Sequence, residues 1–398
     1  MGFKAEINPD VKAILEQPYP FDSVDENKAK AVKKFGKEHI IDFGIGDPTD
    51  PTPEFIREAC KIAVDARKSS GYPASTGHAE FKKAVSDFMK NRFNVSLSPE
   101  EIAATYGAKF ASFHIPLLFL NPKKEETVLI PNPGYPPYTD GTLIAGGAPY
   151  YFNILEENNF LPVFSEIDYK TRERAKIMFL NSPHSPTGKI YSKETLKEAV
   201  DFCNDSNIVL VSDECYSELY YEKAPASVLE ISGSEECSIV LNSLSKRSMM
   251  TGYATGFFAS KNPELLTPFD KILRKSIQGL PSFIQDAATA AFSDSAHSEK
   301  MRSVYRERLS ALVPMLEKTG CKAIMPEGTF FVWAKIPEKF DSALAFSEWL
   351  LLEKGINCVP GDLISKEFNN QNPGKGFVRF ALVPHIEKIK EAAKRLEQ

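Results

Sequence analysis

The chain has 398 residues, which is enough for two or three domains around a sizeable buried core. Hydrophobic residues make up 42% and charged residues 25%, as is ordinary for a soluble globular protein. The formal net charge of −5, without a Lys/Arg-rich run interleaved with aromatic residues, argues against nucleic-acid binding.

The cysteines and histidines bear on location and on metal binding. The six cysteines are scattered without CxxC spacing, which in so long a chain predicts reduced thiols in a cytoplasm. The six histidines form no HxxxH or HxxEH cluster, so we expect no metal site. The opening segment lacks the apolar core of a secretion signal, and no stretch approaches the roughly 18 uninterrupted apolar residues of a membrane span. The expected protein is cytoplasmic and has no membrane or nucleic-acid partner.

In chain order, residues 1–46 are too few to form a core alone and are expected to pack on a small C-terminal domain. In residues 47–291, short apolar and β-branched runs end in polar, Gly or Pro residues: ETVLIPNPGY, AKIMFLNSPHSPTG, NIVLVSDECY and CSIVLNSLSK. Helical patterns lie between several of them, such as SKETLKEAVDFCNDSN after a Ser192 cap. This alternation predicts a large α/β domain, with a mostly parallel sheet flanked by helices.

Residues 292–398 differ from the preceding part of the chain. SAHSEKMRSVYRERLSALVPMLEKTG predicts a long amphipathic helix that stops at Gly320. The strand GTFFVWAKIP, a helix around SALAFSEWLLLEKG, the strand GFVRFALV and the charged helix IEKIKEAAKRLEQ follow it. These elements predict a smaller α+β domain, built from both termini of the chain.

The chemically distinctive residues follow the strands of the predicted large domain. In parallel α/β sheets, the loops at the carboxyl ends of the strands hold the ligand. Four strand ends are followed by Pro133, Gly134 and Tyr135; by Asn181 to Gly188; by Asp213 and Tyr216; and by Ser243, Ser245 and Lys246. Together they offer a carboxylate, two phenols, an amine and hydroxyl groups.

This set matches the needs of pyridoxal phosphate. The aldehyde of this cofactor needs a lysine amine, and its ring nitrogen stays protonated beside a buried carboxylate. Its ring needs an aromatic face, and its phosphate needs hydroxyl and backbone N–H groups at a helix start. Each residue alone has a plainer explanation: a solvated Lys246, a helix cap at Asp213, a core residue at Tyr216, a turn at Tyr135 and a surface ion pair at Arg379. Their joint occurrence favours the cofactor site.

The same residues, in this order, resemble the class I/II aminotransferases of fold type I. The resemblance runs from DFGIGDPTDPTP to FVRFALV, and SLSKRS, DECYSE and NPGKGFVR are closest in wording to the succinyldiaminopimelate aminotransferase branch. It implies transamination between an amino acid and a 2-oxo acid with pyridoxal 5′-phosphate, in amino-acid biosynthesis of the lysine/diaminopimelate type. It also implies a homodimer with active sites at the subunit interface.

The resemblance assigns a role to each candidate residue. Lys246 is the Schiff-base lysine, Asp213 the partner of the ring nitrogen and Tyr216 the donor to the phenolate oxygen. The other assignments are ring stacking by Tyr135; phosphate binding by Ser243, by the backbone of Ala108 and Lys109, and by Tyr72 of the other subunit; and binding of the substrate α-carboxylate by Gly46 and Arg379.

Two positions depart from the family pattern. Ala254 stands where the family usually carries an arginine that pairs with the phosphate, and Ser185 replaces the asparagine of NPTG, which touches the phenolate oxygen. Arg247, an inward-turned Lys109 or a water network are candidates for the missing phosphate contact. The departures leave two alternatives open: another pyridoxal-phosphate reaction, such as β-elimination or C–S lysis, and a non-catalytic descendant.

Overall fold

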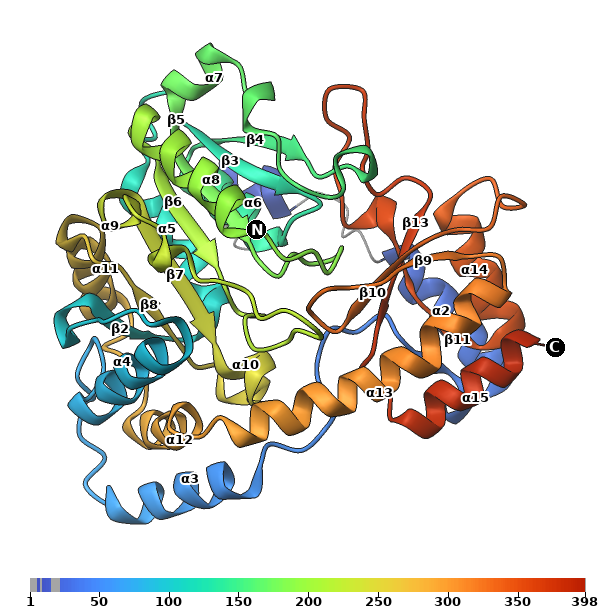
Figure 1. Ribbon diagram of the computed structural model, residues 1–398, viewed down its shortest axis with the longest axis horizontal. Coiled ribbons are helices and arrows are strands. Elements are labelled where there is room, and N and C mark those ends of the chain that lie inside the picture. Colours follow the sequence, from blue (N-terminus) through green and yellow to red (C-terminus); the bar gives the residue numbers. More distant parts are fainter. Residues whose placement is uncertain (1–5, 8, 16–21, 398) are drawn as a thin grey trace, which may run out of the picture.

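The structure, a computed structural model, describes residues 6–7, 9–15 and 22–397, so part of the predicted N-terminal segment lies outside the described residues. Figure 1 shows a unit built on a large sheet and a second, smaller unit, with the long helix α13 (Ala296–Lys318) running from one to the other. The boundaries at residues 46/47 and 291/292 stay a prediction.

The large sheet has seven strands. Their order is β2 (Ile102–Thr105), β8 (Gly256–Ala259), β7 (Ser238–Ser243), β6 (Val209–Asp213), β5 (Ala175–Asn181), β3 (Thr127–Asn132) and β4 (Ala148–Asn153). Neighbouring strands are parallel except that β8 is antiparallel to both β2 and β7. The predicted α/β architecture with a mostly parallel sheet is confirmed.

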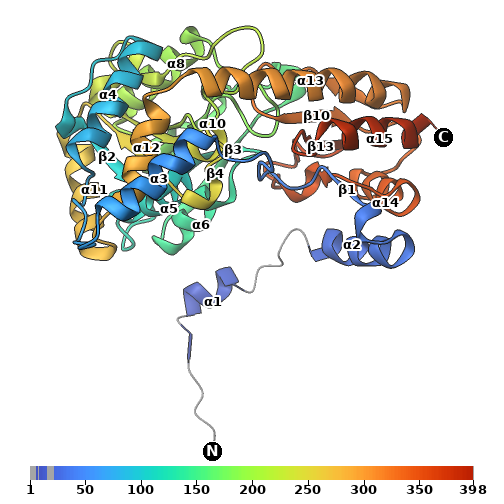
Figure 2. The same cartoon turned by 90° about the horizontal axis from the view of Figure 1, so that it is seen from below.

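Both faces of this sheet are buried because successive side chains of a strand point to opposite faces. In β5, Met178 and Leu180 join one hydrophobic cluster, whereas Ile177 and Phe179 join another. The first cluster packs under α4 (Ala79–Phe93), α8 (Lys193–Ser206) and α12 (Ser282–Phe292), and the second under α5 (Gly107–Phe119), α6 (Pro136–Ile144) and α11 (Pro263–Ser276). Figure 2 shows α4 and α8 on one side and α5 and α6 on the other.

The helix predicted after Ser192 is confirmed as α8. The Ser192 hydroxyl oxygen accepts a hydrogen bond from the backbone N–H of Thr195 at 3.2 Å, which satisfies one of the free donors at the helix start. Leu196 and Val200 are buried against the sheet, as their spacing predicts. Other helices of this unit are α3 (Glu54–Ala66), α7 (Tyr169–Arg174), α9 (Ser234–Cys237) and α10 (Leu244–Arg247).

The smaller unit contains an antiparallel sheet of four strands. Their order is β12 (Val359–Pro360), β13 (Phe377–Ala381), β10 (Phe331–Lys335) and β9 (Lys322–Ile324). The helix α13 ends before Gly320, whose φ of 88° is the left-handed conformation that favours glycine after a helix. The unit also includes α14 (Ala343–Lys354), α15 (Ile386–Glu397) and the parallel pair β1 (Ile41–Asp42) and β11 (Ile356–Asn357).

The N-terminal helices contact different units. The helix α2 (Asp22–Phe35) contacts α14 of the smaller unit, whereas α1 (Pro9–Leu15) contacts α6 of the larger one. Within the described part of the chain, no helix is long and apolar enough to cross a membrane.

Two loops that follow strands of the large sheet are attached to the smaller unit. The backbone N–H of Gly328 donates to the carbonyl of Gly188 at 2.8 Å, and that of Thr329 donates to Leu219 at 2.8 Å. Gly188 has φ +74°, and a Cβ there would lie 2.5 Å from Pro326, so the close approach requires glycine. The loops after β5 and β6 therefore sit at the junction of the two units.

Candidate functional site

A cavity of about 550 Å³ lies at the carboxyl ends of the parallel strands. Its walls include all but one of the residues predicted from the sequence: Gly46, Ala108, Lys109, Tyr135, Ser185, Asp213, Tyr216, Ser243, Lys246 and Arg379. The exception is Tyr72, which is 87% exposed and does not line the cavity.

Lys246 lies on α10, directly after β7. Ser243 caps this short helix, because its hydroxyl oxygen accepts from the backbone N–H of Ser245 at 3.2 Å. The Lys246 ammonium donates to the carbonyl of Gly46 at 2.5 Å. Burial lowers the pKa of Lys246, so a larger fraction of this side chain is present as the neutral amine than for an exposed lysine.

Asp213 ends β6 and is buried at the cavity wall. The Tyr138 hydroxyl donates to its Oδ2 at 2.7 Å, and the backbone N–H of Cys215 donates to its Oδ1 at 3.1 Å. Burial raises the pKa of Asp213, while the hydrogen bonds from Tyr138 and Cys215 act in the opposite direction. A cation placed before this carboxyl would favour its ionised form.

Tyr138 and Cys215 line the cavity but were not predicted from the sequence. Tyr138 is three residues after Tyr135 at the start of α6, and this helical spacing is a signal that a second tyrosine faces the same way. Its ring stacks on Phe179 with centroids 4.4 Å apart. Cys215 gave no signal beyond that of a reduced thiol.

The two predicted phenols differ in exposure. Tyr135 is 41% exposed and stands edge-on to Tyr138, with ring centroids 5.7 Å apart. Tyr216 is buried against Phe330 and Phe331. Burial raises the pKa of both hydroxyl groups, which therefore stay protonated as hydrogen-bond donors near neutral pH.

A concave part of the cavity is bordered by the start of α5, by Ser243 and by Ala254. Gly107 has φ +74°, and a Cβ there would lie 3.5 Å from the Ser243 hydroxyl and 3.9 Å from the backbone of Ala254. Lys109 is exposed at the same rim. Arg247 turns away, because its guanidinium donates to the carbonyls of Ala291 and Asp294. Arg247 is thus excluded as a replacement for the missing arginine.

Arg379 projects into the cavity from β13. Its guanidinium lies 4.4 Å from the centre of the Phe331 ring, and its Nη2 donates to the carbonyl of Gly44 at 3.1 Å. The Nε atom is buried without a hydrogen-bond partner in the described structure. Burial lowers the pKa of Arg379 to about 10, so it remains a cation at neutral pH. An anionic group in the cavity would satisfy it.

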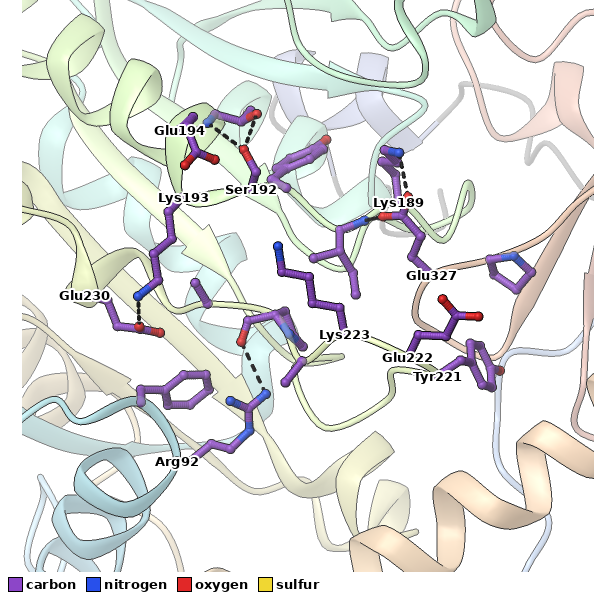
Figure 3. A pocket seen from close by; sticks show the side chains of 18 of the residues that line it. Arg92, Lys189, Ser192, Lys193, Glu194, Tyr221, Glu222, Lys223, Glu230 and Glu327 are labelled. Carbon is purple, nitrogen blue, oxygen red and sulfur yellow. Dashed lines mark hydrogen bonds and ion pairs between the residues drawn. The ribbon is translucent and has the colours of Figure 1, made fainter.

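A larger cavity, of about 930 Å³, lies elsewhere and is lined by none of the predicted residues. Two of its lysines are already neutralised, Lys193 by Glu230 and Lys189 by Glu327, each at 2.6 Å (Figure 3). Among the described residues, no group of three or more His, Cys, Asp or Glu side chains is arranged to hold a metal ion. The unusual chemistry is concentrated in the smaller cavity.

The amino-acid sequence matches the family described as aminotransferase class I and II over residues 38–396. LL-diaminopimelate aminotransferase from Aquifex aeolicus is 37% identical over 383 residues, and the match covers 96% of each chain. The protein of that name from Halothermothrix orenii is 36% identical over 383 residues, covering 96% of this chain and 95% of its own.

Solved structures are similar over the same length. BacF from Bacillus subtilis, in a substrate-bound structure, is 32% identical, with a TM-score of 0.89 and coverage of 99% of this chain and 98% of its own. Aspartate aminotransferase from Thermus thermophilus, a single mutant, is 25% identical, with a TM-score of 0.88 and coverage of 98% and 99%.

The substitution Tyr138→Phe should destabilise the fold. It leaves Oδ2 of the buried Asp213 without its hydroxyl donor, which costs roughly 1–3 kcal/mol. The matched control is Tyr191→Phe, because the Tyr191 hydroxyl is buried and already has no partner in the described structure. Urea unfolding at pH 7 measures both. Equal unfolding free energies for the two variants would contradict the importance of the Tyr138 hydrogen bond.

Proposed function

The chain belongs to the class I and II aminotransferases, and we propose that the cavity at the strand ends is its active site. It transfers an amino group between an amino acid and a 2-oxo acid with pyridoxal 5′-phosphate as the cofactor, and its fold is that of the type I enzymes. The predicted family, reaction and cofactor are confirmed. The relatives carry the LL-diaminopimelate name, which belongs to a branch near the succinyldiaminopimelate one. Their aminotransferase names favour transamination over both alternatives.

The residues of the cavity fit this cofactor. A buried carboxyl, an amine of lowered pKa and an aromatic ring at the mouth are the groups that its ring nitrogen, aldehyde and ring face require. When bound, the cofactor supplies a conjugated ring that withdraws electrons from the substrate Cα. The protein must therefore hold the substrate and move the Cα proton.

We assign the proton transfer at Cα to Lys246. Its lowered pKa raises the fraction of neutral amine, the form that acts as a nucleophile and as a base. Asp213 is assigned to the ring nitrogen and Tyr216 to the phenolate oxygen. The hydrogen bond from Tyr138 supports these roles because it fixes the orientation of the Asp213 carboxyl.

The cofactor phosphate is assigned to the concave part of the cavity. Ser243 and the backbone N–H groups of Ala108 and Lys109 stand there, and the start of α5 favours an anion. Ala254 contributes only a methyl group where relatives of this family usually have an arginine. The concave part of the cavity therefore offers the phosphate dianion fewer cationic contacts than the family pattern provides.

Arg379 and Gly46 are assigned to the substrate α-carboxylate. The unpartnered Nε of Arg379 is the observation that supports this assignment, because a buried guanidinium donor is satisfied when a carboxylate binds. The carbonyl of Gly46 holds Lys246, so the carboxylate and the amine that acts on Cα are arranged around one backbone segment.

The substrate that we propose is chosen to match the two remaining charged residues of the cavity. Asp47 and Lys109 are exposed, have opposite charges and make no side-chain hydrogen bond or ion pair with the described residues. LL-diaminopimelate has a second amino-acid end, whose ammonium suits Asp47 and whose carboxylate suits Lys109. We propose it as the amino donor, in agreement with the names of the relatives.

The proposed assembly is a homodimer in the cytoplasm. Tyr72 is 87% exposed and apart from the cavity of its own chain, as expected of a residue that serves the phosphate of a second copy. Phe55, Ile62 and Val64 of α3 are also exposed apolar residues, which a second subunit would cover. Analytical ultracentrifugation tests the dimer.

Lys246→Ala should abolish transamination while the protein still folds, because this variant has no amine at the position assigned to the Cα proton. The measurement is single-turnover absorbance spectroscopy with an amino donor. The control is Lys82→Ala, which removes another partly buried lysine of lowered pKa that lies outside the cavity. More than a trace of turnover in Lys246→Ala would show that another group acts on Cα.

Ala254→Arg should tighten cofactor binding by about 10- to 100-fold, since a charge-assisted hydrogen bond is worth roughly 1.5–3 kcal/mol. Equilibrium dialysis of wild type and variant gives the dissociation constants. Ala254→Met, which adds similar length without charge, separates the effect of charge from overpacking, which costs roughly 1–3 kcal/mol. An arginine variant that binds no tighter than wild type would mean that another group already occupies this place, with Lys109 or ordered water the first to examine.

Lys109→Met and Asp47→Asn should each lower kcat/KM for LL-diaminopimelate by about 10- to 100-fold, the value of one charge-assisted contact. The specificity constant for L-2-aminoheptanoate, a donor of the same chain length without distal charges, should change by less than about twofold. Lys124→Met, at an exposed lysine outside the cavity, is the control. Equal losses on both donors would contradict the substrate proposal.

A further inference from the structure

The two residues after Lys246 point away from the cavity. Arg247 and Ser248 are each 1% exposed, and their side chains form hydrogen bonds with residues at and beside the connection between α12 and α13. This connection, residues 293–295, leads directly into the helix that carries the smaller unit. The turn that bears Lys246, residues 244–248 and called the lysine turn below, is therefore in direct contact with the junction of the two units.

Ser248 and His297 form the first link. The Ser248 hydroxyl lies 2.8 Å from Nε2 of His297, and Nδ1 of His297 lies 2.6 Å from Oδ1 of Asp294. Burial lowers the pKa of His297, and the charge of Arg247 acts in the same direction. The ring is therefore neutral at pH 7, with Nδ1–H donating to Asp294 and Nε2 accepting from Ser248.

Arg247 forms the second link. Its guanidinium donates to the carbonyl of Ala291 at 2.6 Å and to that of Asp294 at 2.9 Å, and it lies over the Phe88 ring at 4.9 Å. Burial lowers its pKa to about 10, so it remains a cation at neutral pH. This cation satisfies two carbonyls at the end of α12.

The order Ser248, His297, Asp294 is that of a hydrolytic triad, but its surroundings exclude that activity. Ser248 is 1% exposed and His297 is 8% exposed, so a substrate has no access to the hydroxyl. A buried chain of hydrogen bonds of this kind fixes geometry instead, because breaking one link leaves a polar group unsatisfied.

The middle of α13 is tied to the proposed substrate side of the cavity. Arg308 of α13 forms a bidentate ion pair with Asp50, at 2.7 and 2.8 Å. Asp50 is four residues after Gly46 in the chain. The helix α13 thus contacts two parts of the cavity wall. Near its first residues it holds the turn that bears Lys246, and at Arg308 it holds the segment that follows Gly46. A small rotation of α13 would move both.

We propose that His297 is a positioning residue for Lys246: through Ser248 it holds the lysine turn on α13 and so couples the position of the smaller unit to the proton transfer at Cα. His297 contacts neither substrate nor cofactor. The inference rests on the proposed role of Lys246, which Lys246→Ala tests separately.

The test compares His297→Asn with His297→Gln in the holoenzyme. The asparagine amide still reaches Asp294 but is too short for Ser248, whereas the glutamine amide reaches Ser248. His297→Asn should lower kcat about tenfold with KM unchanged, less than the ~100-fold cost of a 1 Å misplacement. His297→Gln should retain most of kcat.

A spectroscopic signature separates positioning from simple destabilisation. The pH midpoint of the absorbance of the bound cofactor depends on how Lys246 is held, so it should shift in His297→Asn and return towards the wild-type value in His297→Gln. Ser248→Ala removes the same hydrogen bond from its other end and gives a second measurement where His297→Asn folds poorly. Its shift should match that of His297→Asn.

The matched control is Ser282→Ala. It removes a serine–histidine hydrogen bond of the same 2.8 Å length, to His78, away from the lysine turn. It should leave kcat and the absorbance midpoint unchanged. Unaltered kcat and midpoint in Ser248→Ala, or equal changes in Ser282→Ala, would overturn the proposal, while activity lost only in Lys246→Ala would leave the proposed function in place.

Discussion

The burial of Asp213 is the constraint on which the site depends. A carboxyl at the end of a central strand is costly to ionise unless donors surround it, and here Tyr138 and the backbone of Cys215 supply them. Because burial still raises the pKa of Asp213, the carboxyl gains most from a positive partner inside the cavity. In the proposed assignment, the protonated ring nitrogen of the cofactor is that positive partner.

The position of that carboxyl follows from strand pairing. β5, β6 and β7 are parallel, so Asn181, Asp213 and the residues after Leu241 reach the same edge of the sheet. The Asn181 amide donates to the backbone carbonyl of Asp213 at 2.9 Å, which ties the ends of two strands together. The loops that continue from these ends are joined to the smaller unit through Gly188 and Leu219. The cavity is consequently closed by both units.

Local signals predicted much of this arrangement. The Ser192 cap, the buried runs of the sheet and the Gly320 stop depend on residues close in sequence, and the structure contains each of them. Tyr138 donates its hydroxyl to Asp213 at the end of β6, and Arg247 points towards carbonyls between α12 and α13. Both contacts join residues far apart in the chain, so neither could be predicted from the local sequence. Tyr72 lies exposed and outside the cavity of its own chain, and its proposed role depends on a second copy, which one sequence does not describe.

The neighbours Lys246 and Arg247 show how one short helix serves two purposes. Successive residues of an α-helix are about 100° apart, so adjacent side chains leave it in different directions. Lys246 enters the cavity, and Arg247 satisfies carbonyls between α12 and α13. The second cation therefore stabilises the base of the lysine turn and does not line the cavity. With Ala254 at the rim, the proposed phosphate site depends on hydroxyl groups, on backbone N–H groups and, in the proposed dimer, on a second subunit. We therefore expect cofactor retention to depend more on assembly than it would with an arginine at that position.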